Sequence, residues 1–367
     1  MSNSKEVWKE EQQFHGGQSW SLIDNYVSDF SVTTNFLGTP KKAIDAAVET
    51  MKNECLHYPA ADFEPALSRM AEWLNVDKQR FTFGNGLSEL IDIVTRMAPK
   101  GAWKGGPYSL EDGACLQYKE YERAAKANDR TILSNTDKDK QEQASIHALV
   151  NPSNPTGAYF ELSDLKKYIE ENVSSNSFVL IDESMLPWQG PDWKNHSLLS
   201  QSEWIANQLE TRQVSVFVLH SWTKIWSCPG LRVGSIVTPD AAALRHLRRL
   251  QVPWSLNSAA LKFLELVVED VEYMQETWAK TTPWRQREID ELTKMFPKWK
   301  FYGESWISWI WIDTGSVETA EKAVQLAHDA GVPVRHAKQG YNAPRFIRIG
   351  IREPEYQDVL FNAWKTL

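Results

Sequence analysis

Short apolar runs alternate with helical stretches through the first two thirds of the chain. The runs at 147–150, 178–181, 214–219 and 233–237 are nearly all apolar and rich in residues that favour strands. Strands buried on both faces of a parallel sheet have this composition. The stretches between them carry apolar residues at intervals of three or four, which is typical of helices. The alternation predicts an α/β sandwich with a mainly parallel central sheet.

Three helices can be placed in this region. Thr39 and Pro40 offer the first helix a hydroxyl cap and a proline in its first turn. The second helix follows the glycine-rich turn at 84–86, and the third is expected over 163–173. The first two carry apolar residues at the spacing of one buried helix face. These stripes are Ile44, Ala47, Val48 and Met51 in the first helix, and Leu87, Leu90, Ile91, Val94 and Met97 in the second.

The pattern changes after Pro253. Amphipathic helical sequence runs over 259–295, and strand-like segments at 306–313 and 345–351 are each followed by a further helix. This mixture predicts a smaller α+β domain. We expect an N-terminal arm over 1–38, a large domain over 39–255 and a small domain over 256–367, with a surface loop over 100–113.

Composition narrows the functions that fit. The 367 residues carry a net charge of −8, which argues against a nucleic-acid or anionic-membrane partner. The N-terminus lacks an apolar signal core, and no run is apolar over the ~18 residues that a membrane span needs. We therefore expect a cytoplasmic protein, with a longer precursor left open. Cys55, Cys115 and Cys228 lack the paired spacing of a zinc site, so no metal is expected. The 17 tryptophans are expected to serve packing.

Lys224 is the first candidate for chemistry. It follows the apolar run 214–219, with Ser221 and Thr223 beside it and Arg232 one short loop later. A lysine amine in this place can form a Schiff base with an aldehyde, while hydroxyls and an arginine can bind a phosphate. For Lys224 taken alone, a surface lysine after a strand is the alternative.

Three further segments offer what pyridoxal 5′-phosphate needs. Asp182 ends an apolar run, where a buried carboxylate would keep a pyridine nitrogen protonated. Asn154 lies in the turn "NPSNPTG", from which its amide could donate to the cofactor's ring oxygen. The turn at 84–88 leads from a strand into a helix and includes Gly86, Leu87 and Ser88. Its small residues would let the backbone approach an anion, and the helix N-terminus would attract that anion. Each segment taken alone has a plainer alternative. Asp182 could cap the next turn, the Asn154 segment could be only a turn, and glycine-rich turns such as the one at Gly86 are common.

In this order the segments resemble the class I/II aminotransferase family of pyridoxal-phosphate enzymes, over nearly the whole chain. Within it the chain resembles histidinol-phosphate aminotransferases and, more closely, L-threonine O-3-phosphate decarboxylases. That closer resemblance rests on "HGG", "HYPAADF", "EYERA", "PGLRVG", "RRLQVPWSLN" and "RFIRIGIREPE". It implies the fold type I of these enzymes, with a large α/β domain and a smaller α+β domain. It also implies a homodimer with shared active sites and a small amino-acid substrate.

The resemblance further implies roles for single residues. Tyr118 matches the aromatic residue that stacks on the cofactor ring. Tyr58 matches a tyrosine that reaches the phosphate of the neighbouring subunit's cofactor. Arginines that grip the substrate's acid groups match Arg335 and Arg348, and the arm that closes over the substrate matches His15, Gly16, Thr33 and Asn35.

Two arginines near one site suggest a doubly anionic substrate, such as one with a carboxylate and a phosphate. The alternative is that Arg345, Arg348 and Arg352 are solvated charges along a strand edge. The chain departs from the family at Thr33, where Asn is usual, at Leu116-Gln117, and at Met185, where aminotransferases carry a tyrosine. An apolar residue at 185 leans toward the decarboxylases.

Three functions follow. The favoured one is decarboxylation at Cα of a small, phosphorylated or doubly anionic L-amino acid. The alternatives are an aminotransferase of the histidinol-phosphate type and a non-catalytic binding protein. Intact Lys224, Asp182, Asn154 and Arg232 argue against the last.

Overall fold

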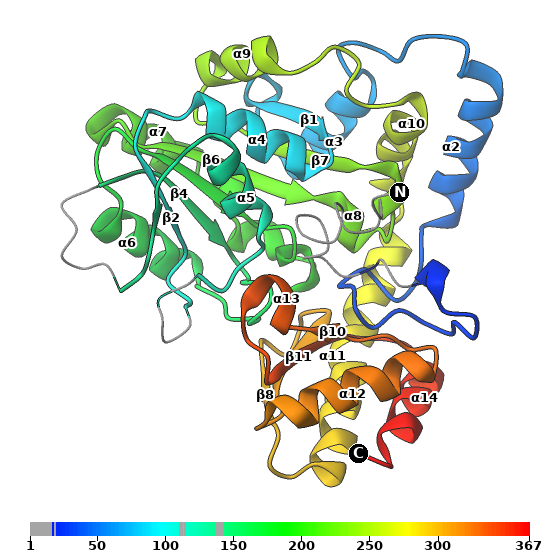
Figure 1. Ribbon diagram of the computed structural model, residues 1–367. Coiled ribbons are helices and arrows are strands. Elements are labelled where there is room, and N and C mark those ends of the chain that lie inside the picture. Colours follow the sequence, from blue (N-terminus) through cyan, green and yellow to red (C-terminus); the bar gives the residue numbers. More distant parts are fainter. Residues whose placement is uncertain (1–16, 18–19, 110–112, 114, 137–142) are drawn as a thin grey trace, which may run out of the picture. The chain divides into compact units, whose positions relative to one another are not determined.

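The computed structural model describes residues 17, 20–109, 113, 115–136 and 143–367 (Figure 1). Two compact units share them. The large unit comprises 37–154 and 159–278, and the small unit comprises the residues up to 36 together with 155–158 and 279–367. The expected bounds of the arm and the two domains stay a prediction.

A seven-stranded sheet forms the middle of the large unit. Its strand order is β1-β7-β6-β5-β4-β2-β3, and only β7 runs antiparallel to its neighbours. The mostly parallel α/β sheet predicted from the sequence is therefore confirmed. The strands are β1 (Phe81–Asn85), β2 (Ala102–Gly105), β3 (Ile132–Leu133), β4 (Ala144–Val150), β5 (Phe178–Asp182), β6 (Ser215–Ser221) and β7 (Val233–Val237).

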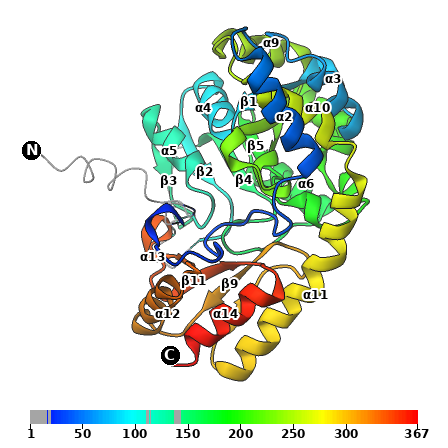
Figure 2. The ribbon, with the colours of Figure 1, turned by 90° about the vertical axis from the view of Figure 1, so that its right-hand side faces the viewer.

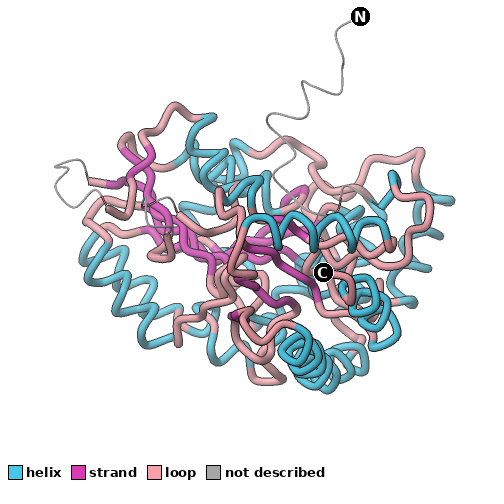
Figure 3. The backbone as a smooth tube through the Cα atoms, turned by 60° about the horizontal axis from the view of Figure 1, so that its bottom comes forward, coloured by secondary structure: helices cyan, strands magenta, loops and turns pink. Residues whose placement is uncertain are grey.

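Helices cover both faces of this sheet (Figures 1 and 3). On one face α4, α5 and α9 share an apolar core with the strands, whereas α6 and α7 lie on the other face (Figure 2). The helices of the unit are α2 (Lys41–Glu54), α3 (Ala66–Leu74), α4 (Leu87–Met97), α5 (Glu120–Ala127), α6 (Leu162–Asn172), α7 (Ser202–Arg212), α8 (Trp222–Ile225), α9 (Ala241–Leu250), α10 (Ser258–Val267) and the first part of α11 (Val271–Met295). Short 3-10 helices include η3 (Leu186–Trp188), η4 (Trp193–His196), η5 (Leu198–Ser200) and η6 (Pro229–Leu231).

The small unit has a four-stranded antiparallel sheet in the order β10-β11-β9-β8. One face packs on α12 and α14 through alternate residues such as Ile310, Ile312, Ile347 and Ile349. The opposite face carries the residues between them. The elements are β8 (Lys300–Tyr302), β9 (Trp309–Asp313), α12 (Val317–Asp329), β10 (Arg335–His336), α13 (Lys338–Tyr341), β11 (Phe346–Gly350), α14 (Pro354–Trp364), the end of α11 and the 3-10 helix η1 (Trp20–Leu22).

One expected element was wrong. Part of the expected surface loop over 100–113 is strand β2, which pairs with β3 and β4 and buries Trp103. The helical sequence expected over 259–295 forms two helices, α10 and α11, and Asp270 caps the second by accepting the Tyr273 amide at 3.1 Å. A four-residue strand and a break inside an amphipathic run leave little periodic signal.

The first expected helix also differs in detail. Thr39 does not cap α2, because its hydroxyl donates to the carbonyl of Ser227 at 2.6 Å. Of the expected stripe, Ala47 is buried, whereas Val48 and Met51 are 48% and 41% exposed. By contrast, α4 buries Leu87, Leu90, Ile91 and Val94 as predicted.

Tryptophans fill much of both cores, as expected. Those of the large unit that are fully buried include Trp103, Trp188, Trp193, Trp222 and Trp226. Among the described helices, none combines the length and the apolar character needed to span a membrane.

Candidate active site

The candidate residues gather where β5 and β6 end. The two parallel strands pair Asp182 with Leu219, and the ladder continues as the Glu183 amide donates to the Leu219 carbonyl at 2.9 Å. On the other side the Asn151 amide donates to the Asp182 carbonyl at 2.8 Å. Side chains at the carboxyl ends of neighbouring parallel strands meet at one edge of the sheet, which is where α/β proteins bind ligands.

One pocket at this edge holds most of the predicted cofactor residues. Its walls add Val150 and Ser184, which the motifs did not single out, and Met185, which the sequence analysis named as a departure from the family. The predicted residues that line it are Leu87, Ser88, Tyr118, Asn154, Asp182, Ser221, Thr223, Lys224 and Arg232.

Asp182 is buried at the base of the pocket. Its carboxylate accepts the Ser184 amide and the Tyr121 hydroxyl, each at 2.9 Å. Burial raises the pKa of Asp182, while these hydrogen bonds and the charge of Lys224 act in the opposite direction. Tyr121 was missed from the sequence because it lies on the buried face of α5, where an aromatic residue usually serves packing.

The other end of the pocket is rich in hydroxyls and positive charge. Lys224 lies on α8, directly after the strand that ends with Ser221. The hydroxyls of Ser221 and Thr223 are 2.8 Å apart, and the Ser221 amide donates to the Ser184 hydroxyl at 2.7 Å. This hydrogen bond joins Ser221, at the end of β6, to Ser184, which lies two residues after Asp182. An anion placed here would meet donors that are already oriented.

Gly86 lets the Arg232 side chain approach the start of α4. The Gly86 amide donates to the Arg232 carbonyl at 2.8 Å. A Cβ at Gly86, whose φ is +71°, would lie 2.2 Å from the Arg232 guanidinium. Any other residue would therefore push the guanidinium away from the N-terminus of α4.

The turn that carries Asn154 is closed by a side chain. The Asn151 amide group donates to the Phe160 carbonyl at 2.9 Å and accepts the Phe160 amide at 2.8 Å. Because Asn151 also extends the β4–β5 ladder, the turn is anchored beside Asp182. Gln117, a departure from the family pattern, is buried and accepts the Gly106 amide at 3.1 Å, which gives it a structural role.

The donor set of the pocket fits pyridoxal phosphate. A buried carboxylate suits a ring nitrogen, Tyr118 offers a ring face, and an amine follows on α8. The hydroxyls, the helix N-terminus and the guanidinium suit a phosphate. Gly86 lets the Arg232 guanidinium come close to the N-terminus of α4. A turn that only capped the helix would not need this close approach.

Four of the predicted substrate residues, Arg335, Arg348, Thr33 and Asn35, lie in the small unit. Arg335 and Arg348 pair across β10 and β11 and are 7% and 6% exposed. Arg348 donates to the Ser31 carbonyl at 2.7 Å. Burial lowers the pKa of Arg335 to about 10 and also lowers that of Arg348. Thr33 and Asn35 are buried in the same unit.

Arg352 is a further buried arginine. Its guanidinium donates to the carbonyls of Asp29, at 2.9 Å from Nε, of Val32 at 3.2 Å and of Thr34 at 3.1 Å. It therefore holds the segment that carries Thr33. The alternative of solvated arginines along a strand edge is wrong for Arg348 and Arg352.

Tyr58 is the predicted cofactor residue that lies apart from this pocket. Tyr58 is 80% exposed, stacks on Trp254 with ring centroids 4.5 Å apart, and does not line the pocket of its own chain. His15 and Gly16 lie outside the described residues.

Comparison with known proteins finds relatives by sequence and by structure. A histidinol-phosphate aminotransferase of Idiomarina loihiensis is 26% identical over 93% of this chain and 90% of its own. A threonine-phosphate decarboxylase of Salmonella typhimurium is 28% identical over 68% of this chain and 67% of its own. The crystal structure of the Sinorhizobium meliloti histidinol-phosphate aminotransferase with pyridoxal-5′-phosphate superposes with a TM-score of 0.75 at 15% identity, covering 93% of this chain and 90% of that one.

The fold is thus that of fold-type I pyridoxal-phosphate enzymes, and the cofactor is pyridoxal 5′-phosphate. Because the model of aminotransferase class I and II matches residues 27–363, this chain belongs to the class I and II aminotransferase family.

Proposed function

We propose that the protein is a pyridoxal-phosphate-dependent aminotransferase of a small anionic substrate, of the histidinol-phosphate type. The observation that carries the proposal is the single pocket in which Lys224, Asp182, Asn154 and Arg232 meet. The preference for decarboxylation drawn from the sequence is not supported, because the relatives are mostly histidinol-phosphate aminotransferases and their similarity extends over more of the chain.

Each residue of the pocket has a task in this proposal. Asp182 would hold a proton on the ring nitrogen, Asn154 would donate to the ring oxygen, and Tyr118 would cover a ring face. Leu87, at the start of α4, would bring a backbone donor to the phosphate, and Gly86 would let Arg232 approach it. The remaining phosphate ligands would be Ser88, Ser221, Thr223 and Arg232. When bound, pyridoxal phosphate supplies an electron sink for bonds broken at the substrate's Cα.

Lys224 would carry the proton transfer. Its Nζ, as a neutral amine, would accept the proton from the substrate's Cα and hold it for transfer within the pocket. Arg335 and Arg348 would hold the acid groups of the substrate, with Thr33 and Asn35 on the same unit. Two buried guanidiniums favour a substrate that bears two negative charges or one divalent anion.

A homodimer is part of the proposal. Its support is an exposed set of apolar side chains in the large unit: Val48, Met51, Leu56, Tyr58 and Trp254 are 41–80% exposed. Apolar residues of this number on one protomer favour burial against a second copy. The exposed Tyr58 would then be free to reach the cofactor phosphate of the partner subunit.

Decarboxylation is the second candidate. The observation that favours it is Met185, which lines the pocket and is 3% exposed, where aminotransferases carry a tyrosine. Without the tyrosine hydroxyl, the pocket has one group fewer to orient the substrate. The orientation of the substrate decides which bond at Cα breaks and therefore which reaction follows.

Product analysis separates the two candidates. The purified protein would be given histidinol phosphate with 2-oxoglutarate, and separately O-phospho-L-threonine. Glutamate formed in proportion to substrate consumed supports the proposal. Carbon dioxide without glutamate would reverse the order of the two candidates.

Arg348→Ala tests the anion grip under either reaction. We expect kcat/KM to fall about 100-fold with cofactor absorbance retained, because a charge-assisted hydrogen bond to the substrate is lost. Arg345→Ala is the matched control, since Arg345 is three residues away, 54% exposed and paired with Asp313. Equal kcat/KM in the two variants would remove Arg348 from the substrate site.

A further inference from the structure

A cavity of about 100 Å³ lies in the large unit, and it shares no lining residue with the candidate cofactor pocket. Its walls come from the end of α3, from η4, from the residue that follows α8, from the end of α10 and from the start of α11. Two of the residues that line it are charged, Lys194 and Asp270. Four are tryptophans: Trp73, Trp193, Trp226 and Trp278. The proposed reaction leaves this cavity without an assigned role.

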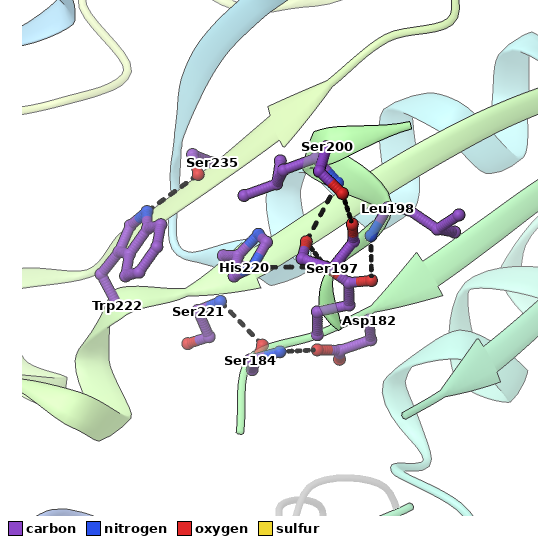
Figure 4. Close-up of polar contacts among 11 residues, drawn as sticks. Asp182, Ser184, Ser197, Leu198, Ser200, His220, Ser221, Trp222 and Ser235 are labelled. Carbon is purple, nitrogen blue, oxygen red and sulfur yellow. Dashed lines mark hydrogen bonds and ion pairs between the residues drawn. The ribbon is translucent and has the colours of Figure 1, made fainter. Parts of the chain in front are cut away.

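The tryptophan walls are packed against one another. Between ring centroids, Trp73 lies 5.9 Å from Trp193 and 5.6 Å from Trp226. Trp222, which does not line the cavity, stacks on Trp226 with centroids 5.1 Å apart. Trp222 is itself fixed, because its Nε1 donates to the Ser235 hydroxyl at 2.8 Å (Figure 4). Walls that are held in this way need little rearrangement to bind a ligand.

Lys194 brings a positive charge to the cavity. Its Nζ lies 4.4 Å from the centroid of the Trp73 ring and donates to the Trp73 carbonyl. Among the residues that the structure describes, none offers Lys194 a carboxylate partner, and burial lowers its pKa. An ammonium group has three donors, and the Trp73 carbonyl takes one of them. A ligand carboxylate could accept from another and would offset the cost of burying the charge.

Asp270 brings a negative charge to the same cavity. Its Oδ1 accepts the Tyr273 amide at 3.1 Å, and its Oδ2 has no partner in the described part of the chain. Asp270 and Lys194 do not pair with each other, so the cavity offers an acceptor and a donor separately. Trp226 adds a second donor, because its buried Nε1 has no hydrogen-bond partner among the described residues. A buried donor without an acceptor is unfavourable, so a ligand oxygen beside it would be stabilising.

The remaining walls are apolar, and the cavity is small. Val267 and Met274 are buried in these walls. The volume is about 100 Å³, whereas an apolar cavity of roughly 150 Å³ holds one benzene molecule. At the packing density of protein interiors, the smaller volume suits an aliphatic side chain of about four carbons better than an aromatic ring.

We propose that this cavity binds a small aliphatic α-amino acid in its zwitterionic form. The carboxylate of the ligand binds Lys194, its ammonium group binds Asp270, and its side chain lies between the tryptophans. The site goes beyond the proposed function and does not depend on it, because none of the residues assigned to the reaction lines the cavity. The bound amino acid contacts the first turns of α11, a helix that begins in the large unit and ends in the small one.

Calorimetric titration of the holoenzyme with L-leucine tests the site. N-acetyl-L-leucine lacks the ammonium group, and L-leucinamide lacks the carboxylate. We expect each of them to bind about tenfold more weakly than L-leucine or worse, because each loses one charge-assisted hydrogen bond. The absorbance of the bound cofactor should not change when L-leucine is added.

Two variants remove the charges while keeping the structural contacts. Lys194→Met keeps an apolar stem over the Trp73 ring, and Asp270→Asn keeps an acceptor for the amide at the start of α11. Each should weaken L-leucine binding about tenfold, with cofactor absorbance and melting temperature close to those of the natural protein. Lys42→Met on α2 is the matched control, because the Lys42 side chain is 73% exposed and does not line the cavity.

Three results would overturn the proposal. The first is the absence of L-leucine binding at about 10 mM, or an equal affinity in the natural protein and Lys194→Met. The second is binding that Arg348→Ala abolishes and Lys194→Met does not, which would assign L-leucine to the substrate residues and leave the proposed function intact. The third is an equal affinity for L-phenylalanine, which would contradict an aliphatic ligand. If Lys194→Met does not fold, Asp270→Asn and the two leucine derivatives decide.

Discussion

At the scale of single residues, the pocket combines a carboxylate that burial makes reluctant to ionise with hydrogen bonds that favour its ionised form. Asp182 shows both effects: burial raises its pKa, and donation from Ser184 and Tyr121 opposes that rise. The motif could reveal Asp182 itself but not Tyr121, which comes from α5, 61 residues earlier in the chain. Partners that tune a catalytic group across such distances in sequence leave no local spacing to read.

Tyr121→Phe tests this tuning. Loss of the 2.9 Å hydrogen bond to Asp182 should raise the pKa of Asp182 further, since the bond favours the carboxylate. The acidic limb of kcat/KM should therefore move to higher pH by about one unit, as expected for a hydrogen bond of about 1.4 kcal/mol. A pH–rate profile measures it, with the exposed Tyr302→Phe as control. An acidic limb that does not move would show that Tyr121 serves packing only.

At the scale of elements, the periodicity of apolar residues predicted helices and strands best where an element is long and is buried on one side or on both. The bounds of β7 and most of the stripe of α4 were predicted correctly, because β7 is buried at every position and α4 buries Leu87, Leu90, Ile91 and Val94. The short strand β2 was not, since four residues flanked by glycine resemble a loop. Val48 and Met51 in α2 fit the helix pattern, but both side chains are exposed. The candidate cofactor pocket was largely predictable, because its residues follow strands in recognisable turns.

The turn between β1 and α4 carries a prediction at this scale. Gly86→Ala should weaken cofactor binding by about tenfold or more, because its Cβ would lie 2.2 Å from the Arg232 guanidinium and displace it. Gly38→Ala is the matched control: its φ of +74° is nearly the same, and a Cβ there meets nothing within 4 Å. Both variants carry the strain of positive φ, so only the approach to Arg232 differs. Equal cofactor affinity in the two variants, measured by absorbance titration, would contradict this role of the turn.

At the scale of the whole molecule, buried carboxyl groups set how stability depends on pH. Glu288 on α11 is fully buried, and burial raises its pKa to about 8. A carboxyl group whose pKa is raised by folding stabilises the folded state fully below its ordinary value of 4.5. That contribution is lost as the pH rises toward about 8, at up to about 1.4 kcal/mol per pH unit.

Glu288→Gln should therefore flatten the pH dependence of stability. Relative to the natural protein, we expect the variant to gain melting temperature at pH 8 and to gain less, or to lose, at pH 5. Thermal unfolding of the apoprotein at the two pH values measures this. Glu272→Gln, on an exposed turn of the same helix, is the control and should shift both values equally. A variant whose difference from the natural protein is the same at both pH values would show that Glu288 stays ionised when buried.

Residues 29–34 belong to no helix or strand, yet Arg348 and Arg352 bind the carbonyl oxygens of Asp29, Ser31, Val32 and Thr34. Every amino acid supplies a carbonyl oxygen, so this mode of attachment does not depend on which side chains the segment carries. Substitutions there, for example at Thr33, can therefore accumulate without altering the path of the backbone. The segment is accordingly a place where selectivity could evolve while the surrounding architecture remains unchanged.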